Sequence, residues 1–130
     1  MEVKNKVVIV TGGGSGIGAA TVKHFAKHGA KVVVADIHPD GAQEIVDQIK
    51  QEGGEAIFHQ VNVAKYEEVE VLVEKTIEHF GQLDVMVNNA GIGPKMMNKT
   101  HEHSLSDWDV VIKVNQTGVF YCMKLALQQM

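Results

Sequence analysis

A glycine-rich segment near the N-terminus has the composition of a phosphate-binding turn. Positions 11–18 are T-G-G-G-S-G-I-G, between an apolar run at 7–10 and an amphipathic stretch at 17–28. Glycine allows a tight turn and the close approach of a pyrophosphate, which a Cβ atom would block. The free N–H groups and the positive dipole end of a following helix favour a bound anion. This pattern predicts a dinucleotide-binding turn, and the alternative is a tight glycine turn without a ligand.

The same segment does not match the phosphate loop of ATP- and GTP-hydrolysing proteins. Gly13 and Gly18 have the spacing of that loop, but Ala19 and Ala20 follow where it requires Lys and Ser or Thr. The lysine reaches the terminal phosphates and the hydroxyl binds Mg²⁺, so neither function is available here. The sequence therefore gives no indication of an ATPase.

Asp36 is the candidate ribose-binding residue. It ends the apolar run at 31–36, about twenty residues beyond the glycines, where dinucleotide-binding proteins place an acid that accepts hydrogen bonds from the adenosine ribose. A carboxylate there repels the 2′-phosphate of NADP, and the sequence contains no arginine to attract it. The position therefore favours NAD as the cofactor. The alternative is that Asp36 only caps the following helix.

These residues lie at the junctions of alternating strands and helices. Short runs rich in valine predict buried strands at 7–10, 31–36, 56–61 and 83–87. Helical spacing and glycine stops predict helices at 17–28, 39–51 and 66–80. Two more helices are predicted, one from about Ser106, with Ser106 and Asp109 as an N-cap pair, and one from near Val114 to Met130. The alternation indicates one α/β domain over 1–130, with a Rossmann-like, doubly wound parallel sheet truncated after the fourth strand and the following helices.

Composition and charge exclude several functional classes. The chain has a net charge of −4 and no arginine, whereas nucleic-acid binding needs clustered basic residues. No apolar run approaches the length of a membrane span or a signal peptide, so a cytoplasmic protein is expected. Cys122 is the single cysteine, which rules out an internal disulfide. The histidine pairs at 24 and 28 and at 101 and 103 lack an acidic or cysteine partner, so no metal site is predicted.

Taken in order, the motifs resemble the short-chain dehydrogenase/reductase family over the whole chain. The resemblance rests on T-G-x-x-x-G-x-G at 11–18, Asp36, Asn62-Val63, N-N-A-G at 88–91, Trp108-Asp109, Val114-Asn115 and Gly118. It implies an NAD-dependent oxidoreductase that transfers hydride between the nicotinamide and an alcohol or carbonyl substrate. The cofactor-binding residues that it implies are Gly12, Ser15, Gly16, Ile17 and Gly18 at the pyrophosphate, Asp36 and Ile37 at the ribose, Asn62 and Val63 at the adenine, and Asn89, Ala90 and Gly91 beside the cofactor.

Asn115 is similar to an asparagine with which the family holds a water in a proton relay. The alternative is a polar side chain that satisfies a local kink of the backbone. The family's other catalytic residues are a serine and a tyrosine that is followed four residues later by lysine. Here Tyr66 is followed by Glu70 and Tyr121 by Leu125, so neither matches, and we expect no turnover from these 130 residues alone.

The uncapped end of the last predicted helix favours an N-terminal piece of an NAD-dependent dehydrogenase. The alternatives are a non-catalytic NAD-binding or assembly module from a truncated gene, and an inert remnant that cannot fold stably. The last helix also has an apolar stripe, made of Phe120, Met123, Leu127 and Met130. Such a stripe is either core or, as it resembles a surface that the family uses for dimer contacts, an interface in a homo-oligomer.

Overall fold

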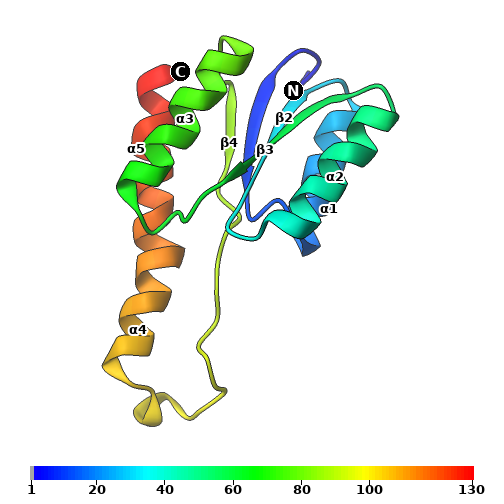
Figure 1. The fold of residues 1–130 in the computed structure, drawn as a ribbon. Coiled ribbons are helices and arrows are strands. Elements are labelled where there is room, and N and C mark those ends of the chain that lie inside the picture. The colour runs from blue at the N-terminus through cyan, green and yellow to red at the C-terminus, as the bar shows by residue number, and fades with distance from the viewer. Residues whose placement is uncertain (1) are drawn as a thin grey trace.

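A computed structural model describes residues 2–130 as a four-stranded parallel sheet with helices on both faces (Figure 1). The strand order is β3-β2-β1-β4. In chain order the elements are β1 (Val7–Thr11), α1 (Gly16–Lys27), β2 (Lys31–Asp36), α2 (Pro39–Gln51), β3 (Glu55–Gln60), α3 (Tyr66–Phe80), β4 (Val85–Val87), the 3₁₀ turn η1 (Thr100–Glu102), α4 (Leu105–Ile112), the π-helical turn η2 (Lys113–Thr117) and α5 (Gly118–Gln129). The predicted Rossmann-like α/β sheet is confirmed.

The two central strands are buried because both faces of the sheet pack against helices. Every residue of β1 is buried, and β2 is buried from position 32 to 35. Alternate side chains of β1 enter opposite layers, with Val8 and Val10 packed toward α1 and α2 and Ile9 toward α3 and α5. Figure 1 shows these two pairs of helices on opposite sides of the sheet. This burial explains the continuous valine runs, because polar residues would alternate with apolar ones in a sheet that exposes one face to solvent.

The N-cap of α4 differs from the prediction. Ser104 has an extended backbone, and its Oγ accepts a hydrogen bond from Asp107 N at 3.1 Å, so that Leu105 is the first helical residue. The predicted N-cap pair of Ser106 and Asp109 is wrong, because Ser106 already lies inside the helix. Both serines can cap a helix, and only the backbone conformation distinguishes them.

The predicted start of a separate helix near Val114 is also wrong. α4, η2 and α5 form one continuous rod, which is visible in Figure 1. Both junctions keep helical backbone angles, with φ −62° and ψ −39° at Lys113 and φ −60° and ψ −40° at Gly118. A π-helical turn adds a residue to the helix without ending it, and such turns are frequent at functional sites. This one contains Asn115.

The apolar stripe of α5 lies at the surface. Its four residues are between 45% and 69% exposed: Phe120, Met123, Leu127 and Met130. The opposite face of the helix is buried against the sheet, as at Leu125. The interpretation of the stripe as core is therefore wrong, and its interpretation as a contact surface stays a prediction. Among the helices of residues 2–130, none is both long and apolar enough to cross a membrane.

Asp84 connects the start of β4 to the start of β1. Its Oδ2 accepts hydrogen bonds from Val7 N at 2.8 Å and from Gln82 Nε2 at 2.7 Å, and its Oδ1 lies 3.4 Å from Lys6 Nζ. The Val7 N–H is the main cause that holds the pKa of the Asp84 carboxyl below its usual value, with burial acting in the opposite direction. The fourth strand begins directly after Asp84, two residues later than predicted.

We predict that Asp84→Asn lowers the free energy of unfolding at neutral pH by about 1–2 kcal/mol, because an amide is a weaker acceptor than a carboxylate. A carboxyl whose pKa falls on folding stabilises the fold above its unfolded pKa of about 3.9, and this contribution is lost as the pH falls through the lower folded value. The difference between wild type and variant should therefore disappear on acidification, as measured by urea denaturation at a series of pH values.

The matched control is Asp47→Asn, which changes an exposed carboxylate on α2 that accepts only from the Gln43 side chain. It should change the free energy of unfolding little at any pH. A difference between wild type and Asp84→Asn that stays constant with pH would contradict the prediction.

Candidate functional site

A cleft of about 400 Å³ opens at the carboxyl ends of the strands. The strand order places β2 and β3 on one side of β1 and β4 on the other, so the direction of the chain across the sheet reverses between β1 and β4. Open α/β sheets bind ligands at such a reversal point, and the volume suits a small molecule. The lining residues are Gly12, Ser15, Gly16, Ile17, Ala35, Asp36, Ile37, His38, Val61, Asn62, Val63, Asn89, Ala90, Gly91, Ile92 and Val114. All the predicted cofactor-binding residues except Gly18 are among them.

The loop between β1 and α1 is held by the end of β2. Gly13 N donates to Ala35 O at 3.2 Å, and Gly14 N donates to Asp36 Oδ2 at 2.9 Å. Ser15 follows as the N-cap residue of α1, and its side chain makes no capping hydrogen bond. The N–H groups of the first turn of α1 are therefore left without a side-chain cap at the cleft, where they can bind an anion.

Gly12 and Gly18 allow the loop and α1 to touch. Gly12 has a φ of +65°, which glycine adopts without strain. A Cβ atom at Gly18 would overlap the Gly12 carbonyl oxygen and lie 2.6 Å from Asn89 Nδ2. Gly18 is buried behind the loop, whereas the family resemblance placed it at the pyrophosphate. Because Gly18 has no side chain, the loop can pack directly against α1.

Asp36 is held from two sides at the end of β2. Its Oδ2 accepts from Gly14 N and its Oδ1 from His38 N, each at 2.9 Å. Each carboxylate oxygen keeps a second lone pair, so two acceptor positions remain for hydroxyl groups of a ligand in the cleft. His38 is the N-cap residue of α2, and Asp36 therefore also orders the start of that helix. Ribose binding and capping, which the sequence left as alternatives, are compatible in this geometry.

Thr11 joins the loop to the N-N-A-G segment that follows β4. Its buried hydroxyl accepts hydrogen bonds from Asn89 N and Ala90 N, both at 3.1 Å, and donates to Val87 O at 3.3 Å. The Asn89 side chain donates in return to Thr11 O at 3.0 Å and to Gly12 O at 3.2 Å. These contacts hold the segment against the loop, so that the two together line the cleft.

Asn62 and Val63 form the part of the cleft that follows β3. Asn62 N donates to Glu68 Oε2 at 2.7 Å, and Asn62 Oδ1 accepts from Ala64 N at 3.0 Å, which orders the turn into α3. The other lone pair of Oδ1 is left for a ligand. Val63 lies against Gly118 of α5, where an added Cβ atom would come within 2.8 Å of Val63 Cγ2.

Asn115, in η2, binds the backbone of the loop that follows β4. Its Oδ1 accepts from Ile92 N at 2.8 Å, and its Nδ2 donates to Ile92 O at 2.9 Å. Asn115 itself is not part of the cleft lining, although Ile92 and the neighbouring Val114 are. The side chain thus satisfies both polar backbone groups of Ile92 in that loop. Its role in a proton relay stays a prediction.

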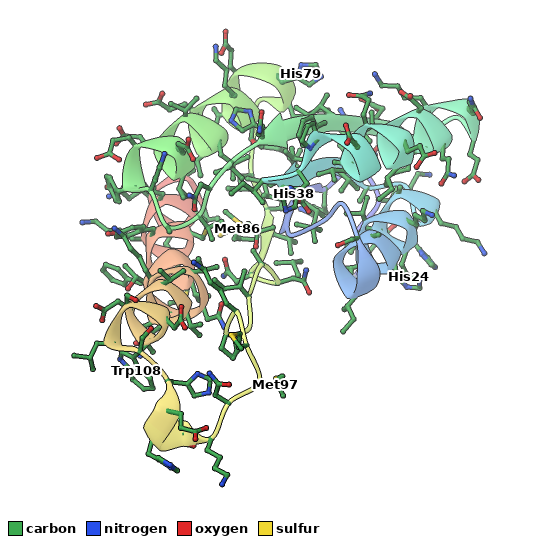
Figure 2. All side chains as sticks on the ribbon, turned by 60° about the horizontal axis from the view of Figure 1, so that its bottom comes forward. His24, His38, His79, Met86, Met97 and Trp108 are labelled. Carbon is green, nitrogen blue, oxygen red and sulfur yellow. The ribbon has the colours of Figure 1, made fainter. Side chains whose placement is uncertain are left out.

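Tyrosine, cysteine and histidine side chains other than His38 are not part of the cleft lining. Tyr66 and Tyr121 pack edge to face, with ring centroids 5.2 Å apart. Burial raises the pKa of the Cys122 thiol to about 11, so that it stays protonated at neutral pH. Figure 2 shows His24 on α1, His79 on α3 and His38 between β2 and α2, well separated from one another, and residues 2–130 contain no group of three side chains that could hold a metal ion.

Known proteins resemble this chain in sequence over nearly its whole length. A sequence model of the family described as short chain dehydrogenase matches residues 6–130. The chain belongs to the short-chain dehydrogenase family. An uncharacterized oxidoreductase of Thermotoga maritima is 45% identical over 130 residues, which cover 100% of this chain and 50% of that protein. Glucose 1-dehydrogenase 2 of Bacillus subtilis is 46% identical over 132 residues, which cover 99% of this chain and 50% of that protein.

The fold agrees with membership of the short-chain dehydrogenase family. The crystal structure of a short-chain dehydrogenase/reductase from Burkholderia phymatum in complex with NAD is similar to this chain with a TM-score of 0.95 and 32% identity. The similarity covers 100% of this chain and 46% of that one. The chain therefore spans about half the length of the relatives that it matches. The family resemblance expected from the motifs is confirmed.

The cleft contains five residues that were not predicted from the sequence. They are Ala35, His38, Val61, Ile92 and Val114. Each is the direct neighbour in sequence of a predicted site residue. At Ala35, His38, Val61 and Ile92 the chain leaves the sheet and exposes consecutive residues to the same space, whereas Val114 lies in η2. The position of a residue next to a predicted site residue could therefore have identified these five cleft residues, whereas their residue types could not.

We predict that Thr11→Val lowers the free energy of unfolding by about 1–3 kcal/mol, because valine keeps the shape but leaves the Ala90 N–H without an acceptor and the Asn89 N–H with Val87 O alone. Urea denaturation measures the change. Thr21→Val is the matched control, since the Thr21 hydroxyl donates only to Ile17 O in its own helix, and it should change the value by about 0.5 kcal/mol or less. Equal losses in the two variants would refute the role assigned to Thr11.

Proposed function

We propose that the cleft binds NAD(H), with the dinucleotide lying across the carboxyl ends of the strands. The observation that supports this most is that the glycine loop, the start of α1 and Asp36 line one cleft. The residues fit the cofactor, because Gly12 and Gly16 present no side chain where a pyrophosphate must approach the backbone. A Cβ atom added at Gly16 would point into open space, which leaves room for a ligand there.

Each part of the cofactor has its proposed residues. These are Ser15, Gly16 and Ile17 with Gly12 at the pyrophosphate, Asp36 and Ile37 at the adenosine ribose, Asn62 and Val63 at the adenine, and Asn89, Ala90 and Gly91 beside the remaining half. The backbone N–H groups at the start of α1 favour the negative pyrophosphate, and the Asp36 carboxylate accepts from the ribose hydroxyls. The proposed binding surface therefore offers hydrogen-bond donors to the pyrophosphate and hydrogen-bond acceptors to the ribose.

The two hydrogen bonds that fix the Asp36 carboxylate support NAD over NADP as the cofactor. Because Gly14 N and His38 N each bind one of its oxygens, the carboxylate cannot rotate away from an incoming 2′-phosphate without losing a hydrogen bond. Two like charges at short distance in a partly buried site repel each other strongly. No arginine exists in the sequence to neutralise the phosphate.

The proposed activity of the whole protein is oxidation of an alcohol or reduction of a carbonyl group in a small molecule. The bound nicotinamide supplies the hydride acceptor or donor for this chemistry. Similarity to glucose 1-dehydrogenase 2 supports this class of reaction. Within this chain, the residues bind and orient the cofactor, and Asn115 orders the loop at Ile92 beside it and is proposed to hold a water for proton transfer.

A non-catalytic NAD-binding or assembly module is the second candidate. The exposed stripe of α5 supports contacts with a second copy, so a homo-oligomer is proposed in either case.

The decisive experiment is a fluorescence titration of the purified 130-residue chain with NADH, and in parallel with NADPH. Saturable binding that prefers NADH supports the proposed site. Absence of saturable binding by a chain whose circular dichroism shows it to be folded would refute it. Adding alcohols to the NAD⁺-loaded chain does not separate the two candidates, because neither predicts NADH formation by these 130 residues alone.

We predict that Asp36→Ala reduces the preference for NADH over NADPH by about tenfold or more, since the variant loses acceptors for the ribose and a charge that repels the 2′-phosphate. Asp36→Arg should reverse the preference. Calorimetry gives the ratio of the two affinities, in which any general loosening of the fold cancels. Asp40→Ala removes a nearby exposed carboxylate of α2 outside the cleft lining and should leave the ratio unchanged, and an unchanged ratio in Asp36→Ala would refute the role of Asp36.

A further inference from the structure

Gly41 is a glycine inside the first turn of α2, where the backbone does not require one. Its φ is not in the left-handed region, in contrast to Gly12 and Gly16. Glycine destabilises a helix relative to alanine because the unfolded chain has more freedom to lose. Helix propensity therefore favours alanine at this position, and the glycine needs another explanation.

The explanation is a close contact between α2 and the loop that follows β1. A Cβ atom at Gly41 would lie 2.7 Å from the carbonyl oxygen of Gly14. That distance is shorter than real Cβ contacts, and the atom that would have to move belongs to the backbone. The two segments are 27 residues apart in sequence and touch only because neither has a side chain at the contact.

Gly14 is confined on its other side as well. Its N–H donates to Asp36 Oδ2 at 2.9 Å, and a Cβ atom at Gly14 would lie 2.9 Å from the same oxygen and 3.3 Å from Ala42 Cβ. The peptide unit of Gly14 is thus placed between the end of β2 and the first turn of α2. Ser15 and Gly16, which follow it directly, line the cleft.

We propose that Gly41 is a positioning residue for the phosphate-binding loop. It contacts no part of the cleft, and acts by letting α2 come close enough to set the position of the Gly14 carbonyl and, through it, of the N–H groups that follow. This inference rests on the proposed binding of NAD(H) at the loop. It assigns to α2 a part in pyrophosphate binding that its sequence does not suggest.

The loop is the part that must move when a side chain is added at Gly41. α2 is anchored next to the contact by Ala42, which is fully buried, and one turn further by Ile45 and Val46, which are 6% and 1% exposed. The loop is buried at Gly13 and half-buried at Gly14, but beyond the contact it is exposed, at Ser15 and Gly16. A methyl group at Gly41 therefore displaces the Gly14 carbonyl, together with the exposed residues that follow it, rather than the helix.

Gly41→Ala tests the inference in the 130-residue chain. We expect the affinity for NADH to fall at least fivefold. Fluorescence titration without urea, where the chain is fully folded, measures this affinity. We also expect the amide signals of Gly14 and Ser15 to shift in the ¹⁵N correlation spectrum. A residue with a merely structural role would lower the urea midpoint and leave the affinity of the folded chain unchanged. Unchanged affinity together with a raised urea midpoint, as helix propensity alone predicts, would overturn the proposal.

Gln43→Ala is the matched control, because it raises helix propensity at an exposed position of the same helix, two residues further on. It should leave NADH affinity unchanged. If Gly41→Ala does not fold, the wild-type chain provides the second measurement. On titration with NADH the amide of Gly41 should shift with the same dissociation constant as that of Gly16, while Lys50 at the far end of α2 stays unchanged. A Gly41 signal that does not move while Gly16 saturates would overturn the proposal.

The outcomes for this inference and for the proposed function are separate. Failure of the folded wild-type chain to bind NADH refutes the proposed function. Binding by wild type and equal binding by Gly41→Ala refutes only the positioning role of Gly41.

Discussion

The hydroxyl of Thr11 is the contact on which the cleft depends. It lies at the end of β1, between the two strand ends that border the reversal point of the sheet, and accepts from two consecutive N–H groups of the segment after β4. The Asn89 side chain completes the connection by donating to the backbone of the loop after β1. Because these buried polar groups are paired, both segments can leave the sheet and turn toward the same space.

A steric constraint acts on the other side of the loop. Gly14 lies between Asp36 and the first turn of α2, and each neighbour approaches so closely that a side chain at Gly14 or Gly41 would collide with it. Asp36 thereby has two effects: it holds the loop through Gly14 N and it presents its remaining lone pairs to the cleft. The proposed preference for a cofactor without a 2′-phosphate and the shape of the loop that follows β1 depend on the same carboxylate.

The sequence predicted the central elements well and the last helices poorly. Strands and helices up to α3 were predictable because valine runs and glycine stops are local signals of burial and of helix ends. The start of α4 was not, because Ser104 and Ser106 are equally good caps. The π-helical turn at Asn115 was missed because helical spacing in the sequence does not distinguish it from an α-helical turn, and the hydrogen bonds of Asn115 to the Ile92 backbone are visible only in the structure.

By itself the sequence determined the order of elements, the family and the residue types of the site, since glycine spacing, an acid at the end of β2 and the N-N-A-G segment are local patterns. Only the tertiary structure decided which glycines border the cleft and which serve packing. Gly16 points into open space, whereas Gly18 and Gly41 are pressed against the backbone of the loop. The distinction depends on contacts between segments far apart in the chain, and no local pattern contains that information.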